Sequence, residues 1–107
     1  MKAGTIKVSV LYPAGEGKTF DMDYYRSKHV PMVADMLGNA VIGATVEEGL
    51  AGGEPNSKPI YHAIGNLYFE SVESFQQAFG AAAEKIMQDT PNYTNIVPLM
   101  QISKVII

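Results

Sequence analysis

The pattern of hydrophobic and polar positions predicts four strands. Residues 5–12 alternate with a period of two and are rich in β-branched side chains, which is typical of a strand. Residues 40–48, 60–69 and 96–106 are predicted as the other three, with Pro98 near the start of the last one. Residues 49–59 are rich in Gly, Pro, Asn and Ser, so we expect a loop longer than a tight hairpin there.

A first helix is predicted between residues 21 and 38. Asp21 is a suitable N-cap, and the Gly38-Asn39 pair is a suitable end. Spacings of 3, 4, 3 and 4 place one stripe of side chains on a single helix face, namely Met22, Tyr25, His29, Met32 and Met36. Pro31 cannot donate to the carbonyl of Ser27, so we expect either a kink or a break beside His29, or the start of a second short helical piece.

A second helix is predicted from Ser71, the expected N-cap, to the Thr90-Pro91-Asn92 segment. Its apolar stripe consists of Val72, Phe75, Phe79, Ala82 or Ala83, and Ile86. The resulting order, β-α-β-β-α-β, is the ferredoxin-like α+β arrangement, with both helices on one face of a four-stranded antiparallel sheet. We expect one domain over residues 1–107, and a homodimer that buries the apolar positions of the other sheet face.

Composition excludes several classes of function. The 107 residues are 47% hydrophobic and 18% charged, with a net charge of −3, which gives no reason to expect a nucleic acid or membrane partner. The absence of Cys excludes thiol catalysis, and the two His residues lack metal-ligand spacing, so we expect no metal. No stretch reads as a signal peptide or a membrane span, so a cytoplasmic location is the default expectation.

His29 is the leading candidate for chemistry because an imidazole on a buried apolar stripe needs a polar partner or a ligand. His also exchanges protons most readily near neutral pH. Tyr25 lies one turn earlier on the same face, and its hydroxyl could orient the imidazole or a substrate oxygen. The alternative is structural: His29 could donate to a backbone carbonyl, and Tyr25 could simply fill the core.

The third strand indicates where a ligand could bind. One face carries Tyr61, Ala63, Gly65, Leu67 and Phe69, with small residues in the middle, which predicts a cavity or a close helix approach. In the first case the wall residues would be Tyr25, His29, Met32, Phe75 and Phe79, with Leu67 beside them and Tyr61 at one end. Tyr93 and Asn92 could reach over the mouth. The opposite face carries His62 and Asn66, which we expect to make hydrogen bonds at the dimer interface.

Several segments resemble the EthD family over nearly the whole chain. The most specific is the Tyr24-Tyr25 pair followed by Lys28-His29-Val30-Pro31; the others are residues 6–13, 20–25, 49–53, 69–73 and 91–94. The resemblance implies a dimeric α+β barrel. It also implies a link to a gene cluster for ethyl tert-butyl ether breakdown, and His29 falls in the family's His-x-Pro motif. Related barrels include lactone isomerases, polyketide cyclases, anthrone monooxygenases and haem-degrading enzymes, so the fold alone does not fix a reaction.

Two functions follow as hypotheses. The first is a cofactor-free enzyme of isomerase, cyclase or dehydratase type, acting in catabolism. His29 would move a proton next to a carbonyl of a small hydrophobic compound, and Tyr25 or Tyr61 would stabilise the oxygen. The second is a non-catalytic binder or carrier of a small hydrophobic metabolite for an oxygenase system. A weaker option is a haem-binding protein with His29 as the axial ligand. The chain contains no Trp, which makes it less similar to the haem-degrading relatives.

Overall fold

A computed structural model describes residues 1–107 and confirms the predicted order of elements. The strands are β1 (Ile6–Pro13), β2 (Gly43–Glu48), β3 (Tyr61–Phe69) and β4 (Leu99–Lys104). The first helical segment comprises α1 (Met22–Tyr24), a π-helix (Tyr25–His29) and α2 (Val30–Leu37), and the second is α3 (Val72–Asp89). Together they form the α+β, ferredoxin-like arrangement that the pattern predicts.

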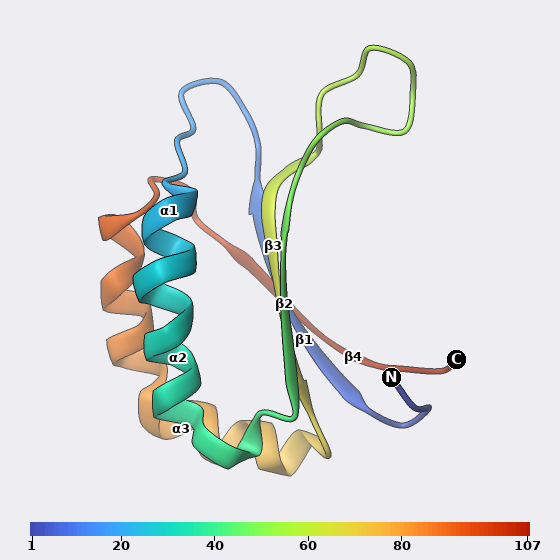
Figure 1. Ribbon diagram of the computed structural model, residues 1–107, viewed down its shortest axis with the longest axis vertical. Coiled ribbons are helices and arrows are strands. Elements are labelled where there is room, and N and C mark those ends of the chain that lie inside the picture. Colours follow the sequence, from blue (N-terminus) through green and yellow to red (C-terminus); the bar gives the residue numbers. More distant parts are fainter.

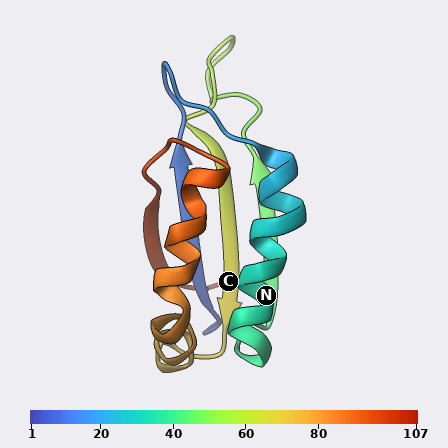
Figure 2. The same ribbon diagram turned by 90° about the vertical axis from the view of Figure 1, so that its left-hand side faces the viewer.

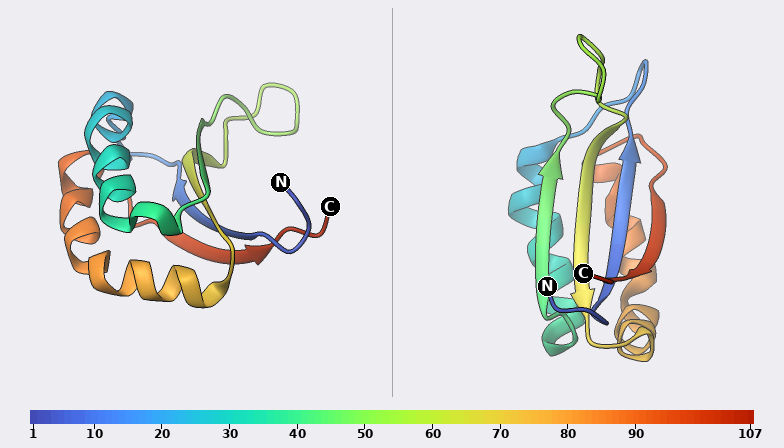
Figure 3. Two further views of the ribbon diagram at one scale, coloured as in Figure 1. Left: turned by 60° about the horizontal axis from the view of Figure 1, so that its bottom comes forward. Right: turned by 90° about the vertical axis from the view of Figure 1, so that its right-hand side faces the viewer.

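The sheet is antiparallel throughout, and its strands lie in the order β2-β3-β1-β4. Both long helices lie side by side over one face (Figure 1, Figure 2). The other face has no helix on it (Figure 3). The hydrophobic core therefore forms only between the helices and one side of the sheet. No helix combines the length and the apolar character needed to cross a bilayer.

The predicted helix starts are confirmed by their side-chain caps. The Tyr24 backbone N–H donates to Asp21 Oδ1 at 3.1 Å, and the Ser74 backbone N–H donates to Ser71 Oγ at 3.0 Å. Each cap satisfies a backbone donor that the first helical turn leaves without a partner. Local sequence alone therefore sets where both helices begin.

The stripe predicted on the first helix is correct up to His29, but beyond it the fully buried positions are Val33 and Leu37, and Met32 is only partly buried. Met36 is 36% exposed, whereas Val33 and Leu37 are 7% and 5% exposed. The cause is the π-helix, in which the Val30 N–H bonds to the Tyr25 carbonyl and one extra residue enters the turn. Pro31 follows directly and has no N–H to continue the regular pattern, as expected at this position. The extra residue rotates the rest of the helix about its axis.

Two strands are shorter than predicted. β2 starts at Gly43 because Gly38–Ala40 forms a 3₁₀ turn, and β4 covers Leu99–Lys104 only. Ile96 does not join the sheet: its N–H donates to Thr94 Oγ1 at 3.0 Å, and its side chain is 3% exposed in an aromatic cluster. Pro98 cannot donate a ladder hydrogen bond, so pairing begins after it.

The core consists of two clusters along β1. Ile6 and Val8 belong to an aliphatic cluster that includes Val33, Leu37 and Phe69 from the helices and β3. Tyr12 belongs to an aromatic cluster whose other members are Tyr25, Ala63, Tyr93 and Ile96. Between the two clusters, Val10 pairs with Gly65, where the sheet carries little side-chain volume. This gap is the starting point for a site.

The faces of β3 are largely as predicted. Ala63 and Phe69 are fully buried in the two core clusters. Asn66 points to the other face, where it accepts from Ser9 Oγ at 3.1 Å and donates to Thr45 Oγ1 at 3.1 Å. His62 lies opposite a register shift between Tyr12 and Pro13, and its ring stacks on Phe20 of the same chain.

Candidate functional site

His29 is held at the end of the π-helix with its side chain turned into the protein. The residue is 5% exposed, and its Nδ1 lies 2.9 Å from Asp89 Oδ2 at the end of α3. A carboxylate can only accept here, so Nδ1 carries the proton and Nε2 of the neutral ring is left as an acceptor. The structural alternative, in which His29 donates to a backbone carbonyl, is therefore wrong, because the partner is the Asp89 carboxylate.

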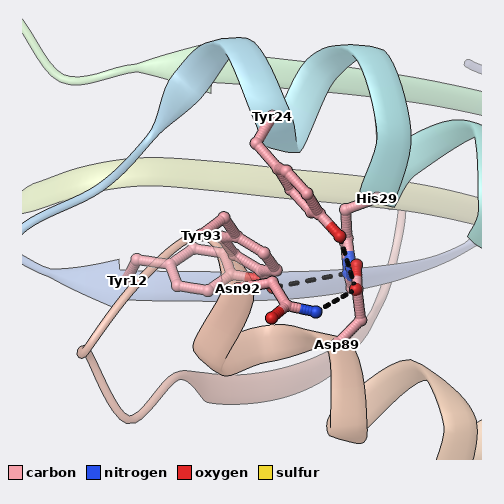
Figure 4. A network of polar contacts seen from close by, with 6 residues as sticks. All are labelled: Tyr12, Tyr24, His29, Asp89, Asn92 and Tyr93. Atoms are coloured by element: carbon pink, nitrogen blue, oxygen red, sulfur yellow. Dashed lines mark hydrogen bonds and ion pairs between the residues drawn. The ribbon is translucent and has the colours of Figure 1, made fainter.

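Asp89 is itself positioned by two further side chains. Tyr24 Oη donates to Asp89 Oδ1 at 2.7 Å, and Asn92 Nδ2 donates to the same oxygen at 2.9 Å (Figure 4). Burial acts to raise the pKa of Asp89. Hydrogen bonds from Asn92, His29 and Tyr24 outweigh burial and hold this pKa below its ordinary value. Asp89 thus stays ionised beside the imidazole.

The other ring nitrogen of His29 meets a chain of phenol groups. Tyr93 Oη lies 3.3 Å from Nε2, and Tyr12 Oη lies 2.8 Å from Tyr93 Oη (Figure 4). Since Nε2 accepts, Tyr93 donates to it and in turn accepts from Tyr12. The distance of 3.3 Å is long for a hydrogen bond, so a bound molecule can replace this contact at low cost.

Tyr25 packs against the imidazole, and its hydroxyl lies beside Gly65 of β3. Its ring stacks on that of His29, with centroids 5.4 Å apart and planes inclined by 17°. Burial raises the pKa of Tyr25 to about 12, and a contact with the Tyr12 hydroxyl opposes this only in part. Burial also raises the pKa of Tyr12 and of Tyr93. The three phenols are therefore neutral at physiological pH.

These polar groups lie on one cavity of about 350 Å³ between the helices and the sheet. Of the predicted site residues, it is lined by His29, Tyr25, Leu67, Phe79 and Tyr93. Three others are not among its lining residues. Phe75 is in the aliphatic cluster, Met32 packs against that cluster because the π-helix rotates it away, and Tyr61 pairs with Pro13 at the start of β3.

The sequence interpretation missed Asp89 and Tyr12. Asp89 lies three residues after Ile86, at the position that extends the apolar stripe of α3. A carboxylate on the apolar face of a helix is the feature by which the sequence could have identified it. Tyr12 shares the buried face of β1 with Val10, and only its hydroxyl marks it out. The residues that define their roles, His29 for Asp89 and Tyr93 for Tyr12, are 60 and 81 positions away in the chain.

The arrangement is suited to moving protons. A carboxylate that fixes the tautomer of an imidazole, with the free nitrogen at an apolar cavity, is a recurring design for a general base. No group of three or more His, Cys, Asp and Glu side chains is placed to hold a metal ion. A haem iron on Nε2 would have to take the place of the Tyr93 hydroxyl.

Comparison with solved structures supports the fold. A DABB family protein from Mesorhizobium loti MAFF303099, described as having a ferredoxin-like fold, has a TM-score of 0.56 at 12% identity, covering 94% of this chain and 95% of its own. An EthD family protein from Bacillus halodurans C-125 has a TM-score of 0.61 at 18% identity, with coverage of 91% and 96%. No curated protein matches the chain.

A third structure is similar in sequence as well as in fold. An EthD-like protein from Ralstonia eutropha JMP134 is 42% identical, with a TM-score of 0.92 over 99% of this chain and 96% of its own. Residues 14–96 match the EthD domain, and this range contains His29, Asp89 and Tyr93. The chain belongs to the EthD family.

Proposed function

We propose that this protein is a cofactor-free enzyme that moves a proton next to the carbonyl of a small hydrophobic compound, in the breakdown of such compounds. The observation that carries the proposal is the position of His29: Asp89 holds Nδ1, Nε2 lies 3.3 Å from Tyr93 Oη, and both His29 and Tyr93 line a mostly apolar cavity. A site that excludes water strengthens both the base and the groups that stabilise charge.

In the proposed reaction, Nε2 of His29 removes a proton from the carbon next to the carbonyl. The electrons of the C–H bond form a C=C bond, and the carbonyl oxygen takes up the negative charge. Tyr93, whose hydroxyl lies 3.3 Å from Nε2, releases the imidazole and donates to that oxygen instead. Asp89 stabilises the imidazolium, as carboxylates do for other catalytic histidines. In a β,γ-unsaturated compound the enolate is conjugated with the second C=C bond, so return of the proton to the γ carbon completes an isomerisation.

Two further tyrosines support this step. Tyr12 donates to Tyr93, and a phenol that accepts a hydrogen bond is a better donor itself. Tyr25 keeps the imidazole ring in its plane by stacking and brings a second hydroxyl to the cavity. Tyr25 therefore keeps the catalytic role proposed from the sequence, although Tyr93 is the closer hydroxyl to Nε2.

The test is exchange of the proton next to the carbonyl for deuterium, followed by NMR in D₂O on a panel of cyclic ketones and lactones. His29→Gln should lower the rate by roughly 10²–10⁴-fold, the usual contribution of a general base. His62→Gln is the matched control, because it removes the only other imidazole of the chain, outside the cavity. Equal exchange rates in wild type and a folded His29→Gln variant would rule out the proposal.

The binder or carrier remains the second candidate and has a distinct result. It predicts saturable binding of the same compounds with no exchange above the buffer rate, unchanged in His29→Gln. The apolar lining of the cavity supports binding as such. Exchange by the wild type that depends on His29 decides for the enzyme.

We also propose that the face of the sheet without helices pairs with a second copy of the chain. Leu11, Ile64 and Leu99 pair across three neighbouring strands on this face. Leu99 is 52% exposed in the single chain. Burying such a surface against its own copy is the simplest way to remove it from water.

A further inference from the structure

The cavity is lined mostly by apolar residues and carries no charged side chain of its own. None of its lining residues is Lys, Arg, Asp or Glu. The Asp89 carboxylate lies beyond the Nδ1 side of the His29 ring and is already engaged by Tyr24 and Asn92. A ligand therefore finds hydrogen-bonding groups in the cavity but no cation.

The volume of the cavity limits the size of the ligand. An apolar cavity of roughly 150 Å³ in another protein holds one benzene ring. The cavity here is about 350 Å³, somewhat more than twice that volume. A molecule of two fused six-membered rings therefore fills it, whereas a single ring leaves much of the apolar wall without contact.

We propose that this site selects neutral two-ring ketones and lactones and rejects the same compounds when they carry a carboxylate. The role of the carbonyl in this inference rests on the proposed function. The selection of neutral compounds over carboxylates concerns binding alone.

The rejection of carboxylates follows from the count of donors and charges. A carbonyl needs one donor, which Tyr93 or Tyr25 supplies, whereas a buried carboxylate needs several donors or a cation. Tyr12 is not free, because its hydrogen bond is made to Tyr93. The positive charge of a protonated His29 would already be paired with the Asp89 carboxylate, which lies 2.9 Å from Nδ1. A carboxylate in the cavity would thus be an unpaired buried charge.

The first experiment compares binding of 1-tetralone and of a ring-carboxylated 1-tetralone, by NMR titration at neutral pH. We expect the carboxylated compound to bind at least about 100-fold more weakly, because an unpaired charge is costly to bury. Binding of both within about 3-fold would overturn the inference, and so would the absence of saturable 1-tetralone binding.

The second experiment adds the missing cation. Met87 lines the cavity and is 66% exposed, so Met87→Arg places a guanidinium at the mouth without disturbing the core. We expect this variant to bind the carboxylated compound at least about 10-fold more tightly than wild type does, as one charge pair allows. Gln88→Arg adds the same charge to the exposed side of α3, outside the cavity, and should leave binding unchanged. Equal gains in both variants would contradict the inference.

Failure of this inference can be told from failure of the proposed function. Selective binding of neutral tetralone without deuterium exchange would reject the enzyme and leave the ligand class standing. Exchange that depends on His29 but proceeds equally well on carboxylated ketones would keep the enzyme and reject the ligand class.

Discussion

The Tyr25 hydroxyl occupies the place over Gly65 where any other residue would carry its Cβ atom. Gly65 lies in the middle of β3, between Val10 of β1 and Val46 of β2. Its backbone is extended, so the glycine serves close approach and not an unusual conformation. The sequence interpretation left open whether the small residues of β3 make a cavity or allow close approach, and at Gly65 both occur.

Gly65→Ala should therefore destabilise the protein. The added methyl group clashes with the Tyr25 hydroxyl and pushes the ring against His29, and overpacking of this kind typically costs about 1–3 kcal/mol. The measurement is the free energy of unfolding in urea. Tyr25→Phe removes the clashing oxygen, so the double variant should lose less than the sum of the two single losses.

Gly80→Ala is the matched control for that substitution. Gly80 lies in α3, and a Cβ there would meet no atom within 4 Å. Alanine at this position should stabilise the helix by roughly 0.5–1 kcal/mol. Strict additivity of Gly65→Ala and Tyr25→Phe would show that the clash is absent.

Asp89→Asn should reduce proton exchange while leaving the fold intact. The amide can hydrogen-bond to Nδ1 with either its oxygen or its NH₂ group, so the tautomer is no longer fixed and the imidazolium loses its counter-charge. We expect a fall of at least about 100-fold in the exchange rate at saturating ketone. Asp35→Asn removes an exposed carboxylate from α2 and serves as the control. A rate in Asp89→Asn like that of Asp35→Asn would contradict the role of Asp89.

The low pKa of Asp89 makes stability depend on acid pH. In the unfolded chain Asp89 takes up a proton near its ordinary value of 3.8, whereas in the folded protein it resists protonation to lower pH. The contribution of Asp89 to the free energy of unfolding is thus complete above pH 3.8 and is lost as pH falls through the pKa of the folded state. Urea unfolding between pH 5 and pH 2.5 should show a shallower loss in Asp89→Asn than in wild type. Parallel curves would refute the shift.

The buried tyrosines make the protein less stable as pH rises in the alkaline range, whereas Asp89 makes it less stable as pH falls. Unfolded Tyr25 ionises near 10.0, while the folded residue keeps its proton to about 12. Its contribution is present below pH 10 and is lost as pH rises towards 12. Tyr25→Phe should therefore lose less stability than wild type between pH 9 and pH 11.5 in urea unfolding. An unchanged slope would mean that Tyr25 is accessible to solvent.

The proposed pairing through the sheet is tested by mass in solution. Light scattering after size exclusion should give about twice the chain mass of 11.6 kDa. Ile64→Glu places a charge in the middle of the proposed interface and should give a monomer. Met36→Glu places the same charge on an exposed position of α2 and should remain a dimer. A monomeric wild type at micromolar concentration would exclude the pairing.

The fold and half of the site could be predicted from the sequence. Asp21 and Ser71 cap their helices through bonds to residues three positions away, and the alternation in β1 sets which side chains face the helices. The same local periodicity identified His29 as a buried polar residue. These features depend on neighbours in the chain, which is why a linear pattern reveals them.

The tertiary structure alone decided what His29 does. Asp89 lies 60 positions away and Tyr93 lies 64 positions away, and no periodicity links a residue on one helix to a partner at the end of another. The π-helix likewise moved the centre of the buried face after His29 to Val33 and Leu37, which leaves Met32 partly buried and Met36 exposed. Local sequence determines elements and faces because short-range geometry is regular, whereas the pairing of an imidazole with a carboxylate depends on how two separate helices pack on one sheet.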